Sequence, residues 1–246
     1  MDKLKAVILA AGKGTRMQSN LPKVLHKVAG KPMVHYTIEA AKEAGADDVI
    51  VVIGYQGNLV RREIVDVVDF VEQTEQLGTG HAVKMAAPLL GGEGDTLVLC
   101  GDTPLITAET IKKLYDTHKR QSNGVTVLSA KLDDPSGYGR IIRDTHGEFQ
   151  KIVEDKDCSA AEKKCSEINS GMYIFNTDAL IATLNMITNE NVQGEYYLTD
   201  TIALIKNAGL KCGAVSVDDI NEILGVNTKA QLETAEEIMQ KRLMNA

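Results

Sequence analysis

The residues best suited to binding phosphate follow the first apolar run of the chain, residues 6–11. That run passes directly into the segment GKGTR of residues 12–16, whose glycine amides could cradle phosphate oxygens. Arg16 and the later Lys23 would add a bidentate donor and a point charge. The segment matches neither the P-loop pattern nor the dinucleotide fingerprint, which needs a third glycine where Met17 stands. A phosphate-binding loop and an ordinary strand-to-helix turn with solvated bases are both open.

One carboxylate could hold a hard cation. Asp102 comes immediately after the apolar run 96–100, and ligands of open α/β sheets bind beyond the carboxyl ends of strands. A lone carboxylate there suits Mg²⁺, which takes one or two protein oxygens together with water and substrate phosphates. The same aspartate could instead open the turn before Pro104. Asn227 comes directly before Thr228, and its residue type favours the start of a helix.

Short apolar runs alternate with longer segments of helical period, the pattern of an α/β protein. The runs 6–11, 49–53 and 96–100 are continuously apolar, as expected for parallel strands covered on both faces. Helices are expected over 32–44, 80–90 and 107–121. After about residue 122 the pattern becomes mixed α+β, and a capping box at Thr228 and Gln231 predicts the start of the last helix. No internal repeat is visible.

Composition excludes several classes of protein. With 43% hydrophobic and 25% charged residues among 246, the chain has the balance of a folded globular protein. The net charge of −7 argues against nucleic acid and anionic membrane as partners. Basic residues are nevertheless concentrated before residue 32, which fits a small bound polyanion or solvated lysines. The four cysteines lack C-x-x-C spacing, so we expect reduced thiols and a cytoplasmic location, and no run is long enough for a membrane span.

Eight sequence blocks, taken in order, indicate a family. They are LAAGKGTRM (9–17), LPKVLH (21–26), EQLGTGHA (75–82), GDTPL (101–105), GYGR (137–140), EINSG (167–171), QGEYYLTD (193–200) and GVN (225–227). With these blocks the chain closely resembles the N-terminal uridyltransferase domain of the bacterial bifunctional N-acetylglucosamine-1-phosphate uridyltransferase / glucosamine-1-phosphate acetyltransferase. The first block is shared by sugar nucleotidyltransferases generally, whereas the later blocks make the resemblance specific.

The resemblance implies a role for each matching residue. Nucleotide contacts are expected from Leu9, Ala10, Ala11 and Gly12, a substrate contact from Gly101, and charge stabilisation on the triphosphate from Arg16 and Lys23. The uracil edge would be read by Gln73, Gly78 and Thr79. Magnesium ligands would be Asp102 and Asn227. The amino sugar would contact Gly139, Glu154 and Asn169, with Tyr197 and Thr199 lining the same site.

The resemblance also implies the architecture: a Rossmann-like nucleotidyltransferase fold of GT-A type, in which helices flank a central, mostly parallel mixed sheet and a smaller α+β part binds the sugar. Residues 1–227 are expected to form the uridyltransferase domain. Residues 228–246 are expected to form an arm helix that begins the linker to a β-helix acetyltransferase domain. Since this sequence has no hexapeptide repeats, we expect a shortened chain or a stand-alone domain, a monomer, without acetyltransferase activity.

The implied reaction is Mg²⁺-dependent transfer of UMP from UTP to N-acetyl-α-D-glucosamine 1-phosphate, which yields pyrophosphate and UDP-N-acetylglucosamine for peptidoglycan and other envelope precursors. Two alternatives stay open: a relative that uses another nucleotide or sugar phosphate, and a nucleotide-sugar-binding module without catalysis. The joint presence of Arg16, Lys23, Asp102 and Asn227 argues against the second. His81 is expected to be structural because it opens an apolar helix, and Cys100 stands where some family members have tyrosine.

Overall fold

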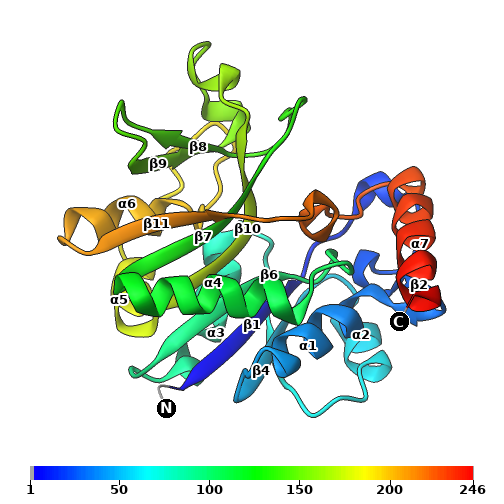
Figure 1. Ribbon diagram of the computed structural model, residues 1–246. Coiled ribbons are helices and arrows are strands. Elements are labelled where there is room, and N and C mark those ends of the chain that lie inside the picture. The colour runs from blue at the N-terminus through cyan, green and yellow to red at the C-terminus, as the bar shows by residue number, and fades with distance from the viewer. Residues whose placement is uncertain (1–2, 246) are drawn as a thin grey trace.

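A mixed β-sheet forms the centre of the computed structural model, which describes residues 3–245 (Figure 1). Nine strands of this part of the chain join one sheet in the order β11-β7-β10-β6-β1-β4-β5, with β8 paired to β10 and β9 paired to β8. The strands are β1 (Leu4–Ala10), β4 (Asp48–Ile53), β5 (Asp69–Glu72), β6 (Asp95–Cys100), β7 (Asn123–Lys131), β8 (Arg140–Arg143), β9 (Phe149–Val153), β10 (Glu167–Asn176) and β11 (Lys211–Ser216). A separate two-stranded sheet contains β2 (Lys27–Val28) and β3 (Lys31–Pro32).

The central strands run parallel, as their continuously apolar sequences predict. Strand β1 pairs in parallel with both β4 and β6, β4 with β5, and β11 with β7. Strand β10 is antiparallel to its neighbours β6 and β7. The carboxyl ends of β1, β4, β5 and β6 therefore lie along one edge of the sheet, and the segments that follow these strands gather there.

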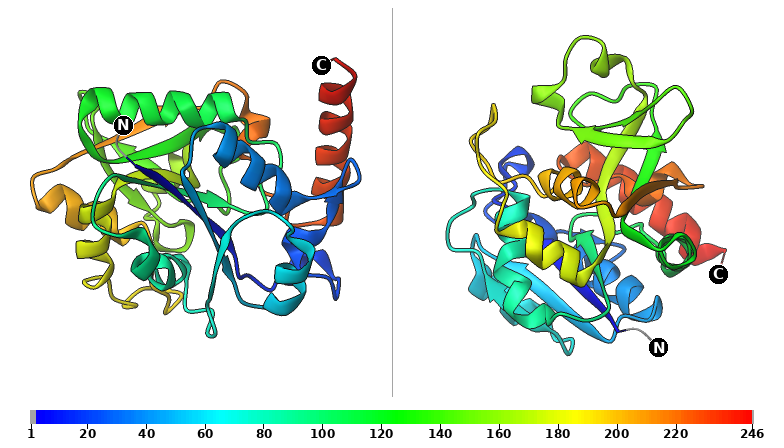
Figure 2. Two further views of the ribbon diagram at one scale, coloured as in Figure 1. Left: turned by 90° about the horizontal axis from the view of Figure 1, so that it is seen from below. Right: turned by 90° about the vertical axis from the view of Figure 1, so that its left-hand side faces the viewer.

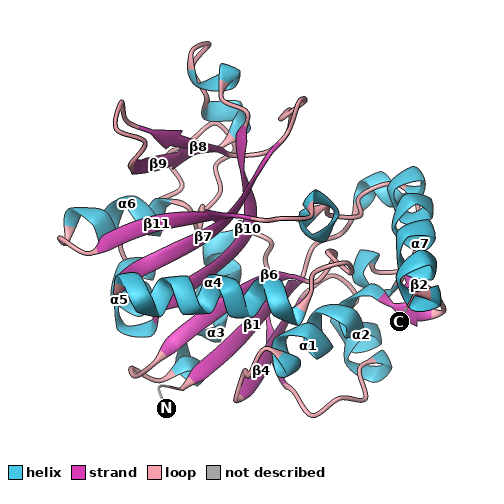
Figure 3. Cartoon of the chain, in the orientation of Figure 1, coloured by secondary structure: helices cyan, strands magenta, loops and turns pink. Residues whose placement is uncertain are grey.

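Helices cover both faces of the sheet (Figures 1 and 3). On one face lie α1 (Met33–Glu43), α2 (Gly57–Glu63) and α4 (Ala108–Gln121), and on the other lie α3 (Thr79–Leu90), α5 (Thr177–Leu184) and α6 (Asp200–Asn207). Alternate residues of a strand face opposite layers. In β1, Ala6 and Ile8 join the core with α1 and α4, whereas Val7 joins the core with α3, α5 and α6.

Two parts extend from this layered body. Strands β8 and β9 and the segment after them form a lobe above the sheet (Figure 2, right). At the other end, α7 (Lys229–Met244) packs beside β2 (Figure 1). The predicted capping box of Thr228 and Gln231 starts this helix. Its buried residues Ala235 and Met239 join a small third core, whereas Leu243 is 60% exposed.

Most long elements match the sequence prediction to within three residues at each end. The strands and helices that periodicity did not reveal are short or polar: α2, α5, β2, β3, β5, β9 and β11. Strands β5 and β9 contain charged residues, and α2 has seven residues, too few for a clear helical period. Among residues 3–245, no helix combines the length and apolarity needed to cross a bilayer.

Candidate active site

A cavity opens at the carboxyl end of β1, where successive strands of the chain are added first to one side of β1 and then to the other. From β1 the chain passes to β4 on one side of the sheet and later to β6 on the other, and Leu9 lies opposite Cys100 between these strands. Such a switch point is where open α/β sheets bind ligands. The cavity measures about 300 Å³. It is lined by Leu9, Ala10, Ala11, Gly12, Lys23, Val24, Gln73, Gln76, Gly78, Thr79, Ala82, Cys100, Asp102 and Glu195.

The loop after β1 is shaped by one glycine. Gly14 has a φ of 61° and caps the 3₁₀ turn Thr15–Met17. A Cβ atom at Gly14 would lie 2.6 Å from the Cβ of Lys23, so only glycine lets the loop approach the lysine this closely. Met17 is buried and anchors the turn, whereas Arg16 is exposed. The sequence therefore brings both predicted phosphate-binding cations to one end of the cavity.

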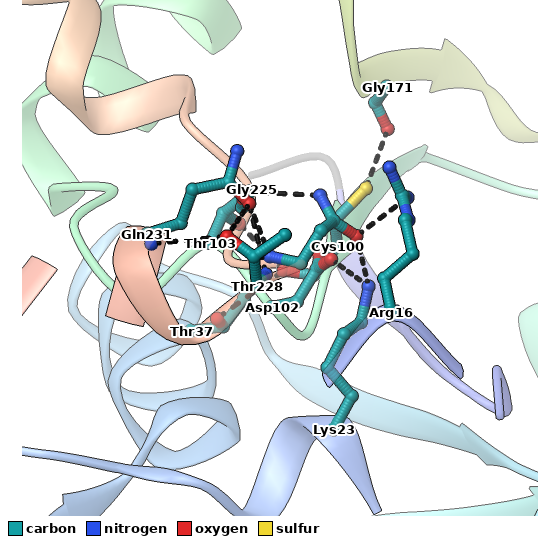
Figure 4. A network of polar contacts seen from close by, with 11 residues as sticks. Arg16, Lys23, Thr37, Cys100, Asp102, Thr103, Gly171, Gly225, Thr228 and Gln231 are labelled. Atoms are coloured by element: carbon teal, nitrogen blue, oxygen red, sulfur yellow. Dashed lines mark hydrogen bonds and ion pairs between the residues drawn. The ribbon is translucent and has the colours of Figure 1, made fainter. Parts of the chain in front are cut away.

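Four predicted residues from three distant segments meet at this end of the cavity. Lys23 forms an ion pair with Asp102, and its Nζ donates to Asn227 Oδ1 at 2.9 Å. Nη2 of Arg16 donates to the same oxygen at 3.0 Å. Figure 4 shows Lys23 reaching Asp102, with the Arg16 side chain beside them. Asn227 Nδ2 donates to the Gly225 carbonyl at 3.2 Å, which turns the amide oxygen toward the two cations.

Asp102 and Asn227 fit a hard divalent cation. Because Lys23 Nζ contacts both Asp102 Oδ2 and Asn227 Oδ1, a single cation can reach both oxygens. The part of the chain that the structure describes contains no cluster of three or more His, Cys, Asp or Glu residues. A cation held here would therefore take one carboxylate and one amide oxygen, and complete its shell with water and ligand phosphates, as Mg²⁺ commonly does.

At the other end of the cavity, hydrogen bonds fix the orientation of the Gln73 side-chain amide. Gln73 is 3% exposed, and its Nε2 donates to the Gly78 carbonyl and to His81 Nδ1, both at 3.0 Å. Since a carbonyl can only accept, this pairing assigns the donor end of the Gln73 amide and leaves the proton of a neutral His81 on Nε2. Gly78 has a φ of 113°, and a Cβ there would lie 2.6 Å from the Tyr196 carbonyl oxygen. His81 thus has a structural role in this arrangement.

A second, smaller cavity adjoins the first and shares Leu9, Thr79 and Cys100 with it. It measures about 190 Å³. Its remaining lining comes from Gly137, Tyr138, Gly139, Glu154, Asn169, Ser170, Gly171, Tyr173 and Leu198. Burial raises the pKa of the Glu154 carboxyl, while the Thr199 hydroxyl, donating to Oε1 at 2.9 Å, opposes that rise. A Cβ at Gly139 would lie 3.3 Å from Glu154 Oε2, so glycine gives the carboxylate its room.

Five of the predicted residues lie beside the cavities rather than in their lining: Arg16 and Asn227, whose contacts are given above, and Gly101, Tyr197 and Thr199. Gly101 packs below the first cavity, where a Cβ would lie 3.1 Å from the Leu9 carbonyl oxygen. The Thr199 hydroxyl donates to Glu154 Oε1, and the Tyr197 hydroxyl donates to Asp157 Oδ2 at 3.1 Å. The structure thus groups the predicted residues around two joined cavities, and their individual roles stay predictions.

The sequence analysis missed several lining residues. Gln76 and Glu195 line the first cavity and Tyr138 lines the second, and all three belong to the sequence blocks that carried the resemblance. Membership of those blocks was therefore a usable signal. Cys100 lines both cavities, and burial raises the pKa of its thiol to about 12, so it remains protonated. Tyr173, which lies in no block, had no such signal.

Comparison with known proteins identifies the family. Residues 5–221 match the family described as nucleotidyl transferase. The chain belongs to the nucleotidyl transferase family. This finding confirms the enzyme family that the sequence blocks predicted.

Two curated relatives are named bifunctional protein GlmU. The protein from Caldanaerobacter subterraneus subsp. tengcongensis is 54% identical over 243 residues, which cover 99% of this chain and 53% of that protein. The protein from Clostridioides difficile is 50% identical over 239 residues, covering 97% of this chain and 52% of that protein. The chain therefore spans about half the length of the curated relatives it matches.

Solved structures confirm the predicted fold class. A UDP-glucose pyrophosphorylase complexed with UDP-glucose has a TM-score of 0.79 and 21% identity, covering 98% of this chain and 100% of that one. A glucose-1-phosphate thymidylyltransferase from Bacillus anthracis, described as putative, has a TM-score of 0.75 and 20% identity, covering 96% and 94%. At such low identity these neighbours establish the shared fold alone.

Proposed function

We propose that the chain transfers UMP from UTP to N-acetyl-α-D-glucosamine 1-phosphate and releases pyrophosphate, with UDP-N-acetylglucosamine as the product for peptidoglycan and other envelope precursors. The observation that carries this proposal is the meeting of Arg16, Lys23, Asp102 and Asn227 beside two joined cavities. The relatives named GlmU and the family match support it.

The first cavity would hold the nucleotide. Uracil offers one imide N–H and two carbonyls, which the Gln73 amide and the backbone at Gly78 and Thr79 could read. Gln73 suits this task because its two hydrogen bonds fix the orientation of its amide. The triphosphate would then extend along the loop after β1 toward Arg16 and Lys23.

The reaction needs alignment and charge neutralisation more than covalent help. A phosphate oxygen of the sugar phosphate attacks the α-phosphorus of UTP, and the bond from that phosphorus to the bridging oxygen of the pyrophosphate breaks. The attacking phosphate is ionised at neutral pH, so no enzyme base is required. Arg16 and Lys23 would stabilise the departing negative charge. Mg²⁺ on Asp102 and Asn227 would supply further neutralisation of phosphate oxygens when bound.

The second cavity would hold the amino sugar. The Glu154 carboxylate can accept hydrogen bonds from sugar hydroxyls, and Thr199 fixes its orientation. Asn169 offers a buried amide to the N-acetyl group. The two cavities meet beside Leu9, Thr79 and Cys100, so a sugar phosphate in one would have its phosphate directed toward a nucleotide in the other.

The proposal extends to the organisation of the chain. Residues 1–227 would carry the transferase, and residues 228–246 an arm helix that leads toward a further domain. We infer a monomer for this chain, acting in the cytoplasm. The four cysteines of this chain are free thiols, as expected in a reducing compartment.

The deciding experiment measures pyrophosphate release from UTP and N-acetylglucosamine 1-phosphate, with Mg²⁺ and with chelator. Glucose 1-phosphate and dTTP serve as parallel substrates. Metal-dependent release with the named pair, and weak release with the others, is the expected result. Strong release with another pair would mean that this other pair contains the substrates. Binding of UDP-N-acetylglucosamine by folded protein without any turnover would favour a binding module instead.

A further inference from the structure

The amide of Asn169 is locked at both ends. Its Oδ1 accepts from the Gly171 backbone N–H at 3.0 Å, and its Nδ2 donates to the Tyr173 hydroxyl at 2.7 Å. Asn169 is 8% exposed and Tyr173 is 3% exposed. Turning the amide over would place its NH₂ against the Gly171 N–H and break that bond. The order of oxygen and nitrogen that Asn169 presents to the second cavity is therefore fixed.

An irregularity in β10 makes this contact possible. Residues four apart in a regular strand are separated by about 13 Å. The pairing of β10 with β7 shifts register between Asn169 and Tyr173, and Gly171 within that interval has a φ of 79°. Ser170 secures the irregular segment, because its Oγ donates to the Leu128 carbonyl at 2.7 Å and accepts from the Met172 N–H at 3.2 Å. The strand thus bends so that the two side chains meet at the cavity.

The Tyr173 hydroxyl can donate a hydrogen bond. The ring is held against Phe175, with 5.4 Å between ring centroids, and it lines the second cavity. Burial, together with the nearby charge of Glu154, raises the pKa of Tyr173 well above its ordinary value, so the hydroxyl keeps its proton. Among residues 3–245 the hydroxyl accepts from Asn169 and donates to no other side chain or backbone group. A ligand acceptor could take this hydrogen.

We propose that Tyr173 is a positioning residue that orients Asn169 and thereby favours a sugar phosphate carrying an acylamino group over one carrying a hydroxyl. The inference rests on the proposed function of the second cavity. An acylamino group has its carbonyl acceptor and N–H donor at fixed places, so it is sensitive to the direction of the Asn169 amide. A hydroxyl donates or accepts by rotating, so it tolerates either direction.

The test is the variant Tyr173→Phe, which removes one oxygen and keeps the ring. Steady-state pyrophosphate release gives kcat and KM for both sugar phosphates and for UTP. We expect KM for N-acetylglucosamine 1-phosphate to rise about tenfold, the scale of one lost hydrogen bond, while KM for UTP and for glucose 1-phosphate stays within about twofold. The matched control is Tyr36→Phe, which removes a hydroxyl that donates to the Val28 carbonyl at 2.7 Å, outside both cavities.

The outcomes separate this inference from the proposed function. Unchanged selectivity in Tyr173→Phe, or equal rises in all three KM values with a lower Tm, would overturn the positioning role. A wild-type protein that prefers glucose 1-phosphate would overturn both proposals. If the wild type releases no pyrophosphate, the proposed function fails, and calorimetric titration with the two sugar phosphates tests the inference directly. Equal affinity ratios in wild type and Tyr173→Phe would then refute it.

Discussion

Replacing Lys23 by methionine tests the charge cluster that carries the proposed function. Methionine keeps much of the length of lysine and removes the ammonium. In the folded protein that ammonium pairs with Asp102 and donates to Asn227, and the Lys23 and Asp102 side chains are 17% and 16% exposed. The substitution therefore removes a largely desolvated charge at the place where pyrophosphate charge would develop.

The expected loss of activity follows from that position. Removing one preorganised donor to developing charge costs about 3 kcal/mol of barrier, which corresponds to a decrease in kcat of about 10²- to 10³-fold. The substitution has a second effect, which favours metal binding. The lysine holds the two oxygens that would bind the metal, so its removal frees Asp102 and Asn227. We expect the Mg²⁺ concentration that gives half-maximal activity to stay the same or to fall.

The assay is pyrophosphate release at saturating UTP and sugar phosphate over a Mg²⁺ titration. The matched control is Lys27→Met, which removes an exposed lysine of the same basic segment on β2. A kcat for Lys23→Met within about threefold of wild type, at saturating Mg²⁺, would refute the assigned role. A much higher Mg²⁺ requirement would show that Lys23 supports the metal site rather than competing for its oxygens.

Three further predictions concern glycines and one buried carboxyl. Gly139→Ala places a Cβ 3.3 Å from Glu154 Oε2 and should raise KM for the sugar phosphate but not for UTP; equal effects on both would contradict it. Gly94→Ala puts a Cβ against the Lys3 carbonyl oxygen, whereas the Cβ of Gly91→Ala meets nothing within 4 Å. Urea unfolding should therefore show a larger loss of unfolding free energy for Gly94→Ala than for Gly91→Ala, and equal losses would contradict this prediction. Burial raises the folded pKa of Glu154 above its unfolded value of about 4.3, so folded protein binds more protons between the two values and stability falls as pH rises through them. In unfolding experiments over this pH range, Glu154→Gln should lack this part of the decrease in unfolding free energy. The same pH dependence in wild type and variant would disprove the prediction.

The central sheet and its ligand-binding edge were predictable from the sequence for a simple reason. Continuous apolar runs predict parallel strands, and parallel strands place their carboxyl ends together. Arg16, Lys23 and Asp102 follow such strands, so their meeting required no knowledge of side-chain packing. The position of Asn227 was harder to predict from the sequence, because it depends on where the last helix packs relative to the sheet. The resemblance supplied that residue, because an asparagine directly before a helix indicates by itself only the start of that helix.

Tyr173 illustrates what periodicity cannot reveal. A tyrosine in an apolar strand normally indicates core, and its ring does lie in the core beside Phe175. The function of its hydroxyl depends on the register shift around Gly171, which alters the distance to Asn169. Regular alternation would assign both residues to one face but would leave them far apart. The contact is a property of the irregularity, and a single sequence gives no measure of where such an irregularity lies.

The last helix, which the resemblance implies is the start of a linker, also belongs to the architecture of the site. Ala235 and Met239 of α7 share a core with Met17 and with Val226. Met17 follows Arg16, and Val226 precedes Asn227, so one small apolar cluster sets the positions of two residues whose side chains are 3.0 Å apart. The Val226 backbone N–H also donates to the Asp102 carbonyl at 2.9 Å. Packing of α7 therefore fixes where the Asn227 oxygen lies relative to Arg16 and Asp102, and the helix acts on the chemistry through the scaffold rather than by direct contact.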